Sequence, residues 1–202
     1  MSLWLAGEPL VLASKSAARQ AVLRAAGVPF DVHPAQVDER AVERDAGAKE
    51  AGEVASLLAR AKAAAVAAHM PGRLVLGADQ TLALGARRFS KPTDRTAAHE
   101  QLRALSGRTH ALHSSVALVR DGRLLFAHVD VARLTMRALS EDFLARYLDA
   151  MGDAVTHSVG AYQLEGLGIH LFERVDGDHF TILGLPLLPL LTHLRQAGQL
   201  AP

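Results

Sequence analysis

The chain contains no cysteine, so disulfide bonds, thiolate nucleophiles and zinc sites with cysteine ligands are all excluded. Aromatic residues are few (six Phe, two Tyr and one Trp), which leaves little surface on which nucleic-acid bases could stack. The 22 Lys plus Arg almost cancel the 21 Asp plus Glu, and a net charge of +1 excludes binding to nucleic acid or to an acidic membrane through bulk charge. We therefore expect a ligand to be held by backbone amides, guanidinium groups, carboxylates or a metal ion.

Long apolar runs are also missing. The first run, residues 10–13, is four residues long and ends at Ser14. The longest late run, residues 182–191, contains Pro186 and Pro189 and cannot form an uninterrupted helix across a membrane. The sequence therefore predicts neither a signal peptide nor a membrane-spanning segment, and a cytoplasmic protein is the default interpretation.

Strand and helix patterns alternate along the chain. Residues 17–26 predict a helix with Ser16 as its N-cap and Gly27 as its stop, and residues 53–69 carry apolar residues near a period of 3.6. Asp121-Gly122 predicts a hairpin turn. The hairpin strands are expected at 109–119 and 124–136, other strands at 10–13, 28–33, 74–77, 169–175 and 180–183, and other helices at 94–105, 141–150 and 187–196, with 38–49 unassigned. This mixture indicates an α/β fold with a mixed sheet.

A strand, a small polar loop and a helix start follow one another at residues 12–19. Backbone amides of such a loop and of the first helical turn point at one spot, where anions bind. Ser14 and Ser16 add hydroxyl donors, and Arg19 lies one turn into the helix, where its planar guanidinium reaches the same spot. The pattern equally suits an ordinary capped helix beside solvated cations, and it is not a Walker loop, which needs a different glycine and lysine spacing.

An aspartate follows the apolar strand at 74–77. A carboxylate at the carboxyl end of a strand in an α/β sheet lies where ligand crevices form, so Asp79 is a candidate to hold a divalent metal or to accept a proton from water. A turn aspartate that bonds its own backbone is the alternative. Lysines are scarce, and Lys62 and Lys91 are two of only four. Each suits either a ligand contact or a solvated charge.

Taken in order, these segments resemble one family, the Maf proteins, which are nucleoside triphosphate pyrophosphatases. The matching segments are LASKSAARQAVLRAAGVPF (12–30), VDE (37–39), LARAKA (58–63), LGADQ (76–80), KP (91–92), LSGRTH (105–110), GAYQLEGLG (160–168) and LGLPL (183–187). The resemblance implies an elongated α/β fold, like that of inosine triphosphatases, with a mixed twisted sheet and a deep cleft between two lobes. We expect residues 1–202 to form a single domain of two lobes without a clear linker.

The resemblance also implies roles for individual residues. It makes Asp79 the catalytic acid, which accepts the proton of the attacking water, and Glu39 a second carboxylate that binds a divalent cation, Mg²⁺ or Mn²⁺, together with Asp79. It makes five residues the phosphate clamp: Ser14, Ser16, Arg19, Lys62 and Lys91. The implied reaction cleaves a nucleoside triphosphate between the α and β phosphates and gives a monophosphate and pyrophosphate. A homodimer is a further expectation, without a nucleic-acid polymer or a membrane as partner.

Three positions depart from the family branch that prefers dTTP and UTP. Ala18 replaces the first arginine of the usual Ser-x-Ser-Pro-Arg-Arg run, Gln80 stands where that branch has Thr, and Glu165 stands where it has Gln. Gln80 and Glu165 are more similar to the branch that accepts 7-methyl-GTP and other nucleotides. An ionised carboxylate only accepts hydrogen bonds, so Glu165 favours the donor-rich edges of guanine or cytosine over uracil and thymine.

The leading hypothesis is therefore an enzyme that removes non-standard or modified nucleotides from the pool. A strict 7-methyl-GTP pyrophosphatase is the close alternative. A nucleotide-binding regulator of cell division without turnover is the alternative from another class. The presence of Asp79, Glu39, Lys62 and Lys91 together favours an enzyme, because a sensor needs no water-activating acid.

Overall fold

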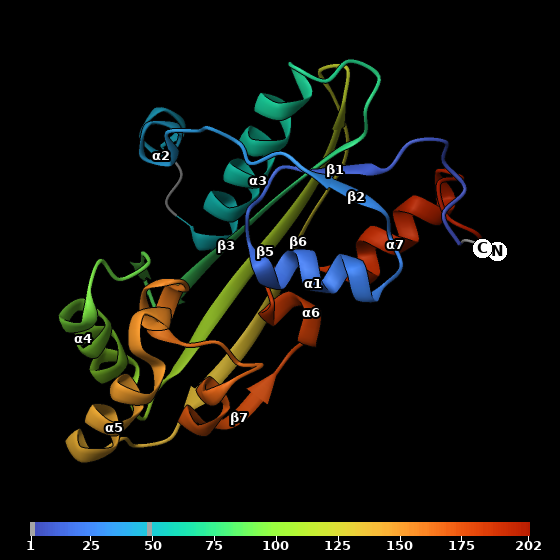
Figure 1. Cartoon of the computed structure of the whole chain (residues 1–202). Coiled ribbons are helices and arrows are strands. Elements are labelled where there is room, and N and C mark those ends of the chain that lie inside the picture. The colour runs from blue at the N-terminus through green and yellow to red at the C-terminus, as the bar shows by residue number, and fades with distance from the viewer. Residues whose placement is uncertain (1–2, 48–49) are drawn as a thin grey trace. The chain divides into compact units, whose positions relative to one another are not determined.

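The computed structural model describes residues 3–47 and 50–202 (Figure 1). The strands are β1 (Leu10–Leu12), β2 (Phe30–Val32), β3 (Val75–Leu84), β4 (Arg87–Phe89), β5 (Thr109–Arg120), β6 (Arg123–Met136) and β7 (Phe172–Asp176). The α-helices are α1 (Ala17–Ala25), α2 (Glu39–Ala46), α3 (Ala51–Ala67), α4 (Arg95–Leu105), α5 (Glu141–Met151), α6 (His179–Ile182) and α7 (Leu187–Gln196). Three short 3₁₀ helices are η1 (Gly152–Thr156), η2 (Val159–Ala161) and η3 (Leu167–Leu171).

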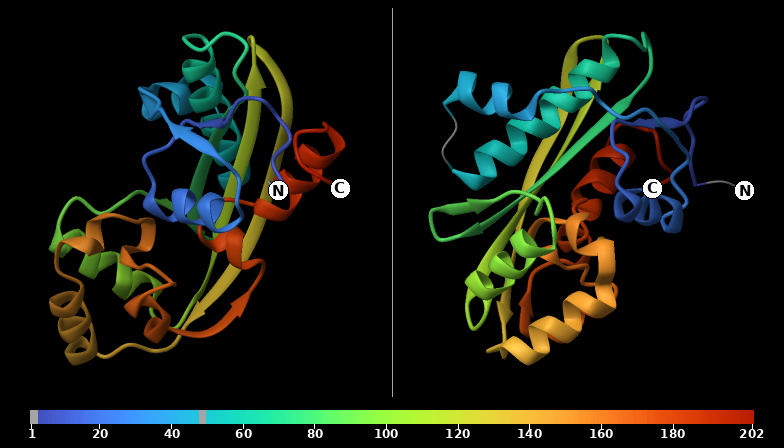
Figure 2. Two further views of the ribbon diagram at one scale, coloured as in Figure 1. Left: turned by 45° about the vertical axis from the view of Figure 1, so that its right-hand side comes forward. Right: turned by 60° about the vertical axis from the view of Figure 1, so that its left-hand side comes forward.

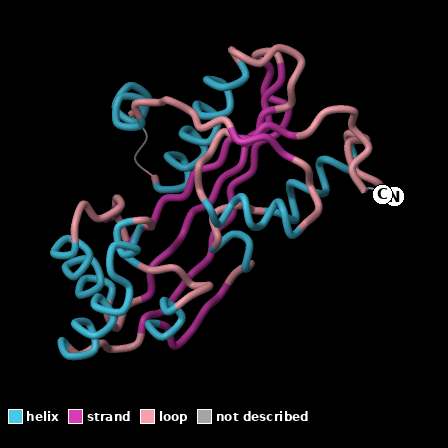
Figure 3. Tube along the Cα trace, viewed as in Figure 1, coloured by secondary structure: helices cyan, strands magenta, loops and turns pink. Residues whose placement is uncertain are grey.

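Within the described residues, seven strands form one mixed sheet in the order β2-β1-β3-β5-β6-β7, with β4 paired to β3 (Figure 3). Strand β1 runs parallel to both of its neighbours, whereas β4 pairs antiparallel with β3 and β7 antiparallel with β6. The turn between β5 and β6 has φ values of 49° at Asp121 and 73° at Gly122, as a tight hairpin turn requires. The predicted α/β class with a mixed sheet is therefore confirmed.

The chain divides into two compact units. The first contains the residues up to Gln80, 114–130 and 178–202, and the second contains 81–113 and 131–177. The expectation of a single domain, with a cleft between two lobes, stays a prediction.

In the first unit, helices cover both faces of the sheet because side chains alternate along each strand (Figures 1 and 2). Leu10 and Leu76 point to one face, where Leu23 of α1 and Leu190 of α7 pack on them. The opposite face carries Val11, Ala13, Val75, Ala117 and Val119, against Ala59, Ala63, Val66 and Ala67 of α3. The terminal segments lie side by side, since Leu5 donates a backbone hydrogen bond to Gln199.

In the second unit, α4 and α5 pack together with η1 and η2. Asp94 caps α4 by accepting a hydrogen bond from Ala97, and Ser140 caps α5 by accepting one from Phe143. The buried His110 ring is 2.7 Å from the Tyr162 hydroxyl, and burial lowers the pKa of His110 to about 4, so that this imidazole is neutral at pH 7. His110 Nε2 is therefore paired inside this unit, whereas the buried His110 Nδ1 has no hydrogen-bond partner among the described residues.

Several sequence predictions fail at particular segments. The strand predicted at 180–183 is wrong, because Asp178 accepts a hydrogen bond from the Thr181 amide and starts the one-turn helix α6. The strand predicted at 169–175 begins only at Phe172, after η3. A short apolar run does not distinguish a strand from a buried helical turn, which accounts for both errors. The unassigned stretch 38–49 forms α2 over Glu39–Ala46, while Lys49 lies outside the described residues.

The predicted end of the strand at Asp79 is also wrong. Strand β3 continues to Leu84, and Leu82 pairs with Phe89 of β4. Asp79 is therefore a buried residue inside a strand rather than a residue of the loop that follows one. None of the helices within residues 3–47 and 50–202 combines the length and the apolar character that crossing a bilayer demands.

Candidate active site

The loop between β1 and α1 is held in place by its own serines. Ser16 is the N-cap of α1, and its Oγ accepts a hydrogen bond from the Arg19 amide at 3.4 Å. Ser14 is buried, and its Oγ accepts a hydrogen bond from the Ser16 amide at 3.2 Å. The predicted cap at Ser16 is confirmed. The first amides of α1 therefore lie next to this loop, at the amino end of the helix.

Arg19 is fixed by neutral oxygen atoms. Its Nε donates to the Gly184 carbonyl at 2.9 Å, and its Nη1 donates to the Ala78 carbonyl at 2.9 Å and to Ser14 Oγ at 3.1 Å. Burial lowers the pKa of the guanidinium, while the carboxylates of Asp79 and Glu39 act in the opposite direction. Arginine stays protonated in proteins, so the site contains an oriented positive charge whose hydrogen-bonding partners leave it unneutralised.

Lys62 joins two carboxylates. Its Nζ lies 2.6 Å from Asp79 Oδ1 and 2.7 Å from Glu39 Oε1. The side chains of Lys62 and Asp79 are only 13% and 10% exposed, whereas that of Glu39 is 50% exposed. Lys62 is therefore a largely buried, paired charge rather than a solvated one, and its role in binding a ligand stays a prediction.

Gly77 allows α3 to approach β3 closely enough for this contact. A Cβ atom at Gly77 would lie 2.1 Å from the Ala59 carbonyl oxygen and 2.9 Å from the Ala63 Cβ. Any side chain here would therefore push the helix away from the strand. Because Lys62 is on α3 and Asp79 is on β3, the missing side chain at position 77 is what brings their charged groups together.

Asp79 has an unusual protonation equilibrium. Burial raises the pKa of Asp79 above its ordinary value, and the nearby positive charges of Lys62 and Arg19 only partly offset this effect. A carboxylate with a raised pKa binds a proton more readily and is a better general base near neutral pH. Lys62 contacts Oδ1, so Oδ2 is the oxygen left for another partner.

The two carboxylates also suit a divalent cation. Across the described residues, no three His, Asp or Glu side chains are grouped so that they alone could hold a metal ion. Magnesium, however, is commonly bound through one or two carboxylates together with substrate phosphates and water. Asp79 and Glu39, joined through Lys62, provide hard oxygen donors of that kind, so the residues present fit such an ion.

Gln80 points to the opposite face of β3 from Asp79 and is engaged within the protein. Its Nε2 lies 2.9 Å from Ser114 Oγ, 3.2 Å from the Thr181 carbonyl and 3.0 Å from the Ile182 carbonyl. Carbonyl oxygens only accept, so the atom that faces them must be the amide nitrogen. The amide oxygen of Gln80 is therefore the polar atom of this side chain that is available to a ligand.

The structure thus brings together Ser14, Ser16, Arg19, Glu39, Lys62, Asp79 and Gln80 in the first unit. Ala18 is a half-buried residue of α1. Lys91 and Glu165 are exposed residues of the second unit. Lys91 follows β4, and Glu165 lies between η2 and η3. The predicted roles of all of these residues stay predictions.

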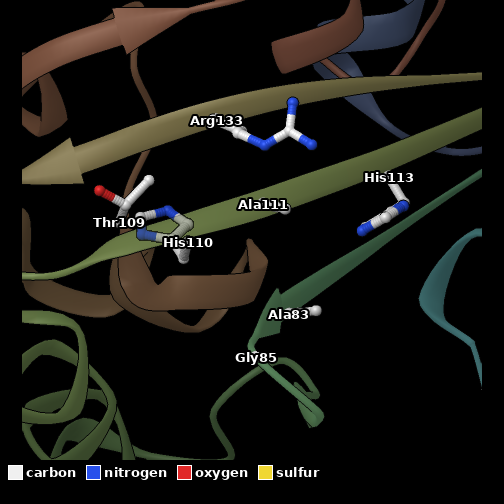
Figure 4. A pocket seen from close by; sticks show the side chains of 7 residues that line it. All are labelled: Ala83, Gly85, Thr109, His110, Ala111, His113 and Arg133. Carbon is white, nitrogen blue, oxygen red and sulfur yellow. The ribbon is translucent and has the colours of Figure 1, made fainter.

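The second unit has a hollow of about 200 Å³ of its own (Figure 4). It is lined by Ala83, Gly85, Thr109, His110, Ala111, His113 and Arg133. None of these residues was predicted for the site. Figure 4 shows Arg133 on β6 and His113 on β5 among the lining residues.

Sequence reasoning missed the partners of the predicted side chains. The carbonyls of Ala78 and Gly184 that orient Arg19 carry no signal of their own, because every residue has a carbonyl group. Gly77 did carry a signal, since a glycine inside an apolar strand marks a close approach of another backbone.

The fold and the site define an α/β protein with an oriented cationic group beside a buried, lysine-bound carboxylate. Residues 9–197 match the family model described as Maf-like protein, and the chain belongs to the Maf family. It is 61% identical over 201 residues to a nucleoside triphosphate pyrophosphatase of Rhodopseudomonas palustris (strain HaA2), with 100% of each chain covered. It is 55% identical over 192 residues to a 7-methyl-GTP pyrophosphatase of Rhizobium etli, with 94% of this chain and 96% of the relative covered.

Among solved structures, a nucleoside-triphosphatase / dITP/XTP pyrophosphatase from Mycobacterium abscessus matches with 17% identity and a TM-score of 0.43, over 95% of each chain. A likeness of this size establishes nothing about activity. The predicted membership of the Maf family is confirmed by the family match and by the close relatives.

Proposed function

We propose that the protein hydrolyses nucleoside triphosphates between the α and β phosphates and releases a nucleoside monophosphate and pyrophosphate. The observation that carries the proposal is the contact of Lys62 with both Asp79 and Glu39, next to an Arg19 that only neutral groups orient. In this arrangement Arg19 is available to a polyanion, and Asp79 is a carboxylate that can accept a proton. The names of the relatives support the same reaction.

The loop at Ser14–Arg19 binds the phosphates. Amides at the amino end of α1 and the Arg19 guanidinium attract the negative charge, and the hydrogen bonds that already hold Arg19 reduce the cost of ordering it. The role proposed for Lys91 is to add a further positive charge for the phosphates. Catalysis of phosphoryl-group reactions rests mostly on such positioning and charge neutralisation.

Asp79 activates the attacking water. Its Oδ2 accepts a proton while the water oxygen forms a bond to the α-phosphorus and the bond from that phosphorus to the bridging oxygen breaks. Pyrophosphate leaves with the bonding electron pair. The raised pKa of Asp79 makes the carboxylate basic enough for this transfer, and Lys62 fixes its other oxygen.

Asp79 and Glu39 would hold the divalent cation, Mg²⁺ or Mn²⁺, together with substrate oxygens. When bound, the ion supplies charge neutralisation for the phosphates. Lys62 keeps the two carboxylates near each other and limits their mutual repulsion.

The base is selected by groups that accept hydrogen bonds. Glu165 is a carboxylate, and Gln80 has only its amide oxygen left for a ligand, because its nitrogen is engaged inside the protein. Both favour guanine or cytosine over thymine and uracil. Non-standard or modified nucleotides with donor-rich edges are therefore the proposed substrates. The proposed location of the reaction is the cytoplasm. The homodimer stays a prediction.

A strict 7-methyl-GTP pyrophosphatase is the second candidate, favoured by the relative from Rhizobium etli. Methylation at N7 gives the guanine ring a positive charge, which a carboxylate at position 165 would attract. A Glu165→Gln variant separates the candidates, because it should lower the preference for 7-methyl-GTP over GTP if the charge on Glu165 creates that preference.

A panel of nucleotides tests the proposal. Release of pyrophosphate is measured with GTP, 7-methyl-GTP, CTP, UTP and dTTP, each with Mg²⁺ and with Mn²⁺. The proposal expects hydrolysis of guanine or cytosine nucleotides to exceed that of dTTP. Hydrolysis of dTTP as the best substrate would contradict the base selection, and binding without any turnover would favour a regulator.

A further inference from the structure

Two buried polar side chains have no part in the reaction described above. Ser114 of β5 and Thr181 of α6 are both fully buried. Ser114 Oγ donates to the Thr181 carbonyl at 2.7 Å. Because its single proton is used in this way, Ser114 Oγ acts as an acceptor toward Gln80 Nε2 at 2.9 Å.

Thr181 is held from its other side by two acids. Its Oγ1 donates to Asp130 Oδ2 at 2.9 Å, and its amide donates to Asp178 Oδ1 at 3.0 Å. Every polar group of Thr181 therefore has a partner, and the partners come from β3, β5, β6 and the start of α6. Buried polar groups with complete hydrogen bonding favour a single conformation of the backbone that carries them.

The backbone fixed in this way leads directly to Arg19. Gln80 Nε2 lies 3.0 Å from the Ile182 carbonyl, and two residues later the Gly184 carbonyl accepts from Arg19 Nε. Gly184 has φ +84°, a conformation that L side chains rarely adopt, and an added Cβ would lie 3.4 Å from Arg19 Nε. The segment 181–184 thus presents one carbonyl to the guanidinium at close range.

We propose that Gln80, Ser114 and Thr181 are positioning residues that act through the segment 181–184 on Arg19. They hold the Gly184 carbonyl where it orients the guanidinium toward the phosphates. This inference rests on the proposed function of the same site. It assigns Gln80 a role that does not depend on the base of the nucleotide, beside the base selection expected of it.

The role through Arg19 makes a distinct prediction for kinetics. Ser114→Ala removes the donor to the Thr181 carbonyl and one acceptor of Gln80, so the segment loses one hydrogen bond, and Gln80, which also holds the segment, loses another. The inhibition constant for inorganic pyrophosphate should rise by about three- to tenfold, which is the effect of losing one or two hydrogen bonds of ordinary net strength. The values of kcat/KM for GTP, CTP and dTTP should fall by the same factor, because Arg19 contacts phosphates and not bases.

A matched control comes from the same strand. Ser115 is also fully buried, but its Oγ donates to the His128 carbonyl at 2.9 Å rather than to the segment 181–184. Ser115→Ala should therefore leave the inhibition constant for pyrophosphate unchanged while it removes a hydrogen bond of similar burial. Thr181→Val and Thr181→Ser form a second pair. The Val variant loses the hydrogen bond to Asp130, whereas the Ser variant keeps a hydroxyl group for it. Only the Ser variant should therefore retain the wild-type inhibition constant for pyrophosphate.

A double-mutant cycle decides the route of the effect. In an Arg19→Lys background the hydrogen bond from the guanidinium to the Gly184 carbonyl is already lost. Ser114→Ala should then change the inhibition constant for pyrophosphate by less than twofold. The inference would be overturned if the effects of the two substitutions on the inhibition constant were fully additive. It would also be overturned if Ser114→Ala changed the ratio of kcat/KM between nucleotides without changing pyrophosphate binding. If Ser114→Ala does not fold, Gln80→Leu at a half-buried position provides the same cycle.

The failure of this inference is distinguishable from that of the proposed function. If the wild-type protein hydrolyses no nucleotide, the proposed function is wrong, yet calorimetric binding of pyrophosphate still compares Ser114→Ala with Ser115→Ala. Equal binding by these two variants, in a protein that does turn over, would contradict the positioning role alone.

Discussion

Two cationic side chains of the candidate site, both in the first unit, have opposite surroundings. Arg19 is oriented by two carbonyls and a hydroxyl group, and so retains its full positive charge for a ligand. Lys62 is bound to Asp79 and Glu39, and this trio carries a net negative charge when both acids are ionised. The comparison makes the proposed binding of a polyanion compatible with a net charge of +1: Arg19 donates to the Ala78 carbonyl of β3, whereas the next side chain, Asp79, pairs with Lys62.

The two halves also differ in how they are built. The Arg19 half depends on hydrogen bonds to carbonyls that come from distant parts of the sequence. The Lys62 half depends on one close approach of a helix to a strand at Gly77. Substitutions should therefore affect the halves separately, and the following predictions run from the largest expected effect to the smallest.

Asp79→Asn should have the largest effect on turnover. The amide cannot take a proton from water, so kcat should fall by about 10²- to 10⁴-fold, the usual contribution of a general base. Binding of nucleotide should persist, because the Arg19 half is unchanged. Steady-state kinetics and calorimetry measure the two effects, and undiminished turnover would show that Asp79 is not the base.

Arg19→Lys should weaken phosphate binding in particular. Lysine keeps the charge but cannot donate to Gly184, Ala78 and Ser14 from one planar group, so kcat/KM should fall by about 10- to 100-fold for every nucleotide. The inhibition constant for pyrophosphate measures the loss without chemistry. A base-dependent change would contradict the assignment.

Gly77→Ala should damage the Lys62 half. The added methyl group overlaps the Ala59 carbonyl, and overpacking of this kind costs about 1–3 kcal/mol or more. Unfolding in urea measures the cost, and kcat should fall in the folded variant because Lys62 moves away from Asp79. Gly7→Ala is the control, because a Cβ at Gly7 meets nothing within 4 Å, and equal effects of the two changes would contradict the account.

Lys62→Met should move the acidic limb of the pH–rate profile. Lys62 lowers the pKa of Asp79 against the upward effect of burial, so removal of its charge raises that pKa further. The base then stays protonated to a higher pH, and the limb of kcat/KM should move to higher pH. A profile that keeps its position, at reduced amplitude, would show that Lys62 does not tune Asp79.

Asp79→Asn should have a small stabilising effect on folding. Because burial raises the pKa of Asp79 above its ordinary value of 3.8, the fold favours the protonated acid. The stability from this group is present below pH 3.8 and is lost as the pH rises through the higher folded value. Thermal unfolding should show a modestly higher Tm for the variant at pH 7, and the difference should shrink toward acid pH. A lower Tm at pH 7 would contradict this.

Local signals predicted much of the fold. Ser16 as a cap, Gly27 as a stop, with φ +67°, and the Asp121-Gly122 turn depend on residues close in sequence, and the structure contains all three. The one-turn helix α6 was missed because its start depends on the side chain of Asp178, while its apolar residues suit a strand equally well.

The site was predictable as a set of residue types but not as an arrangement. Asp79 was expected at a strand end, whereas continuation of β3 buries it and raises its pKa. Lys62 had two interpretations until the approach of α3 at Gly77 placed it between two acids. The carbonyls that orient Arg19 belong to Ala78 and Gly184, which are separated from Arg19 by 59 and 165 positions in the sequence. No pattern in the sequence marks them.

Calorimetric titration of inorganic pyrophosphate without added metal tests the separation of the two halves most directly. The account predicts that Arg19→Lys loses most of the wild-type affinity, while Asp79→Asn binds as tightly as the wild type or more tightly, because it removes a negative charge near the anion. Equal losses in the two variants, or full affinity in Arg19→Lys, would contradict it.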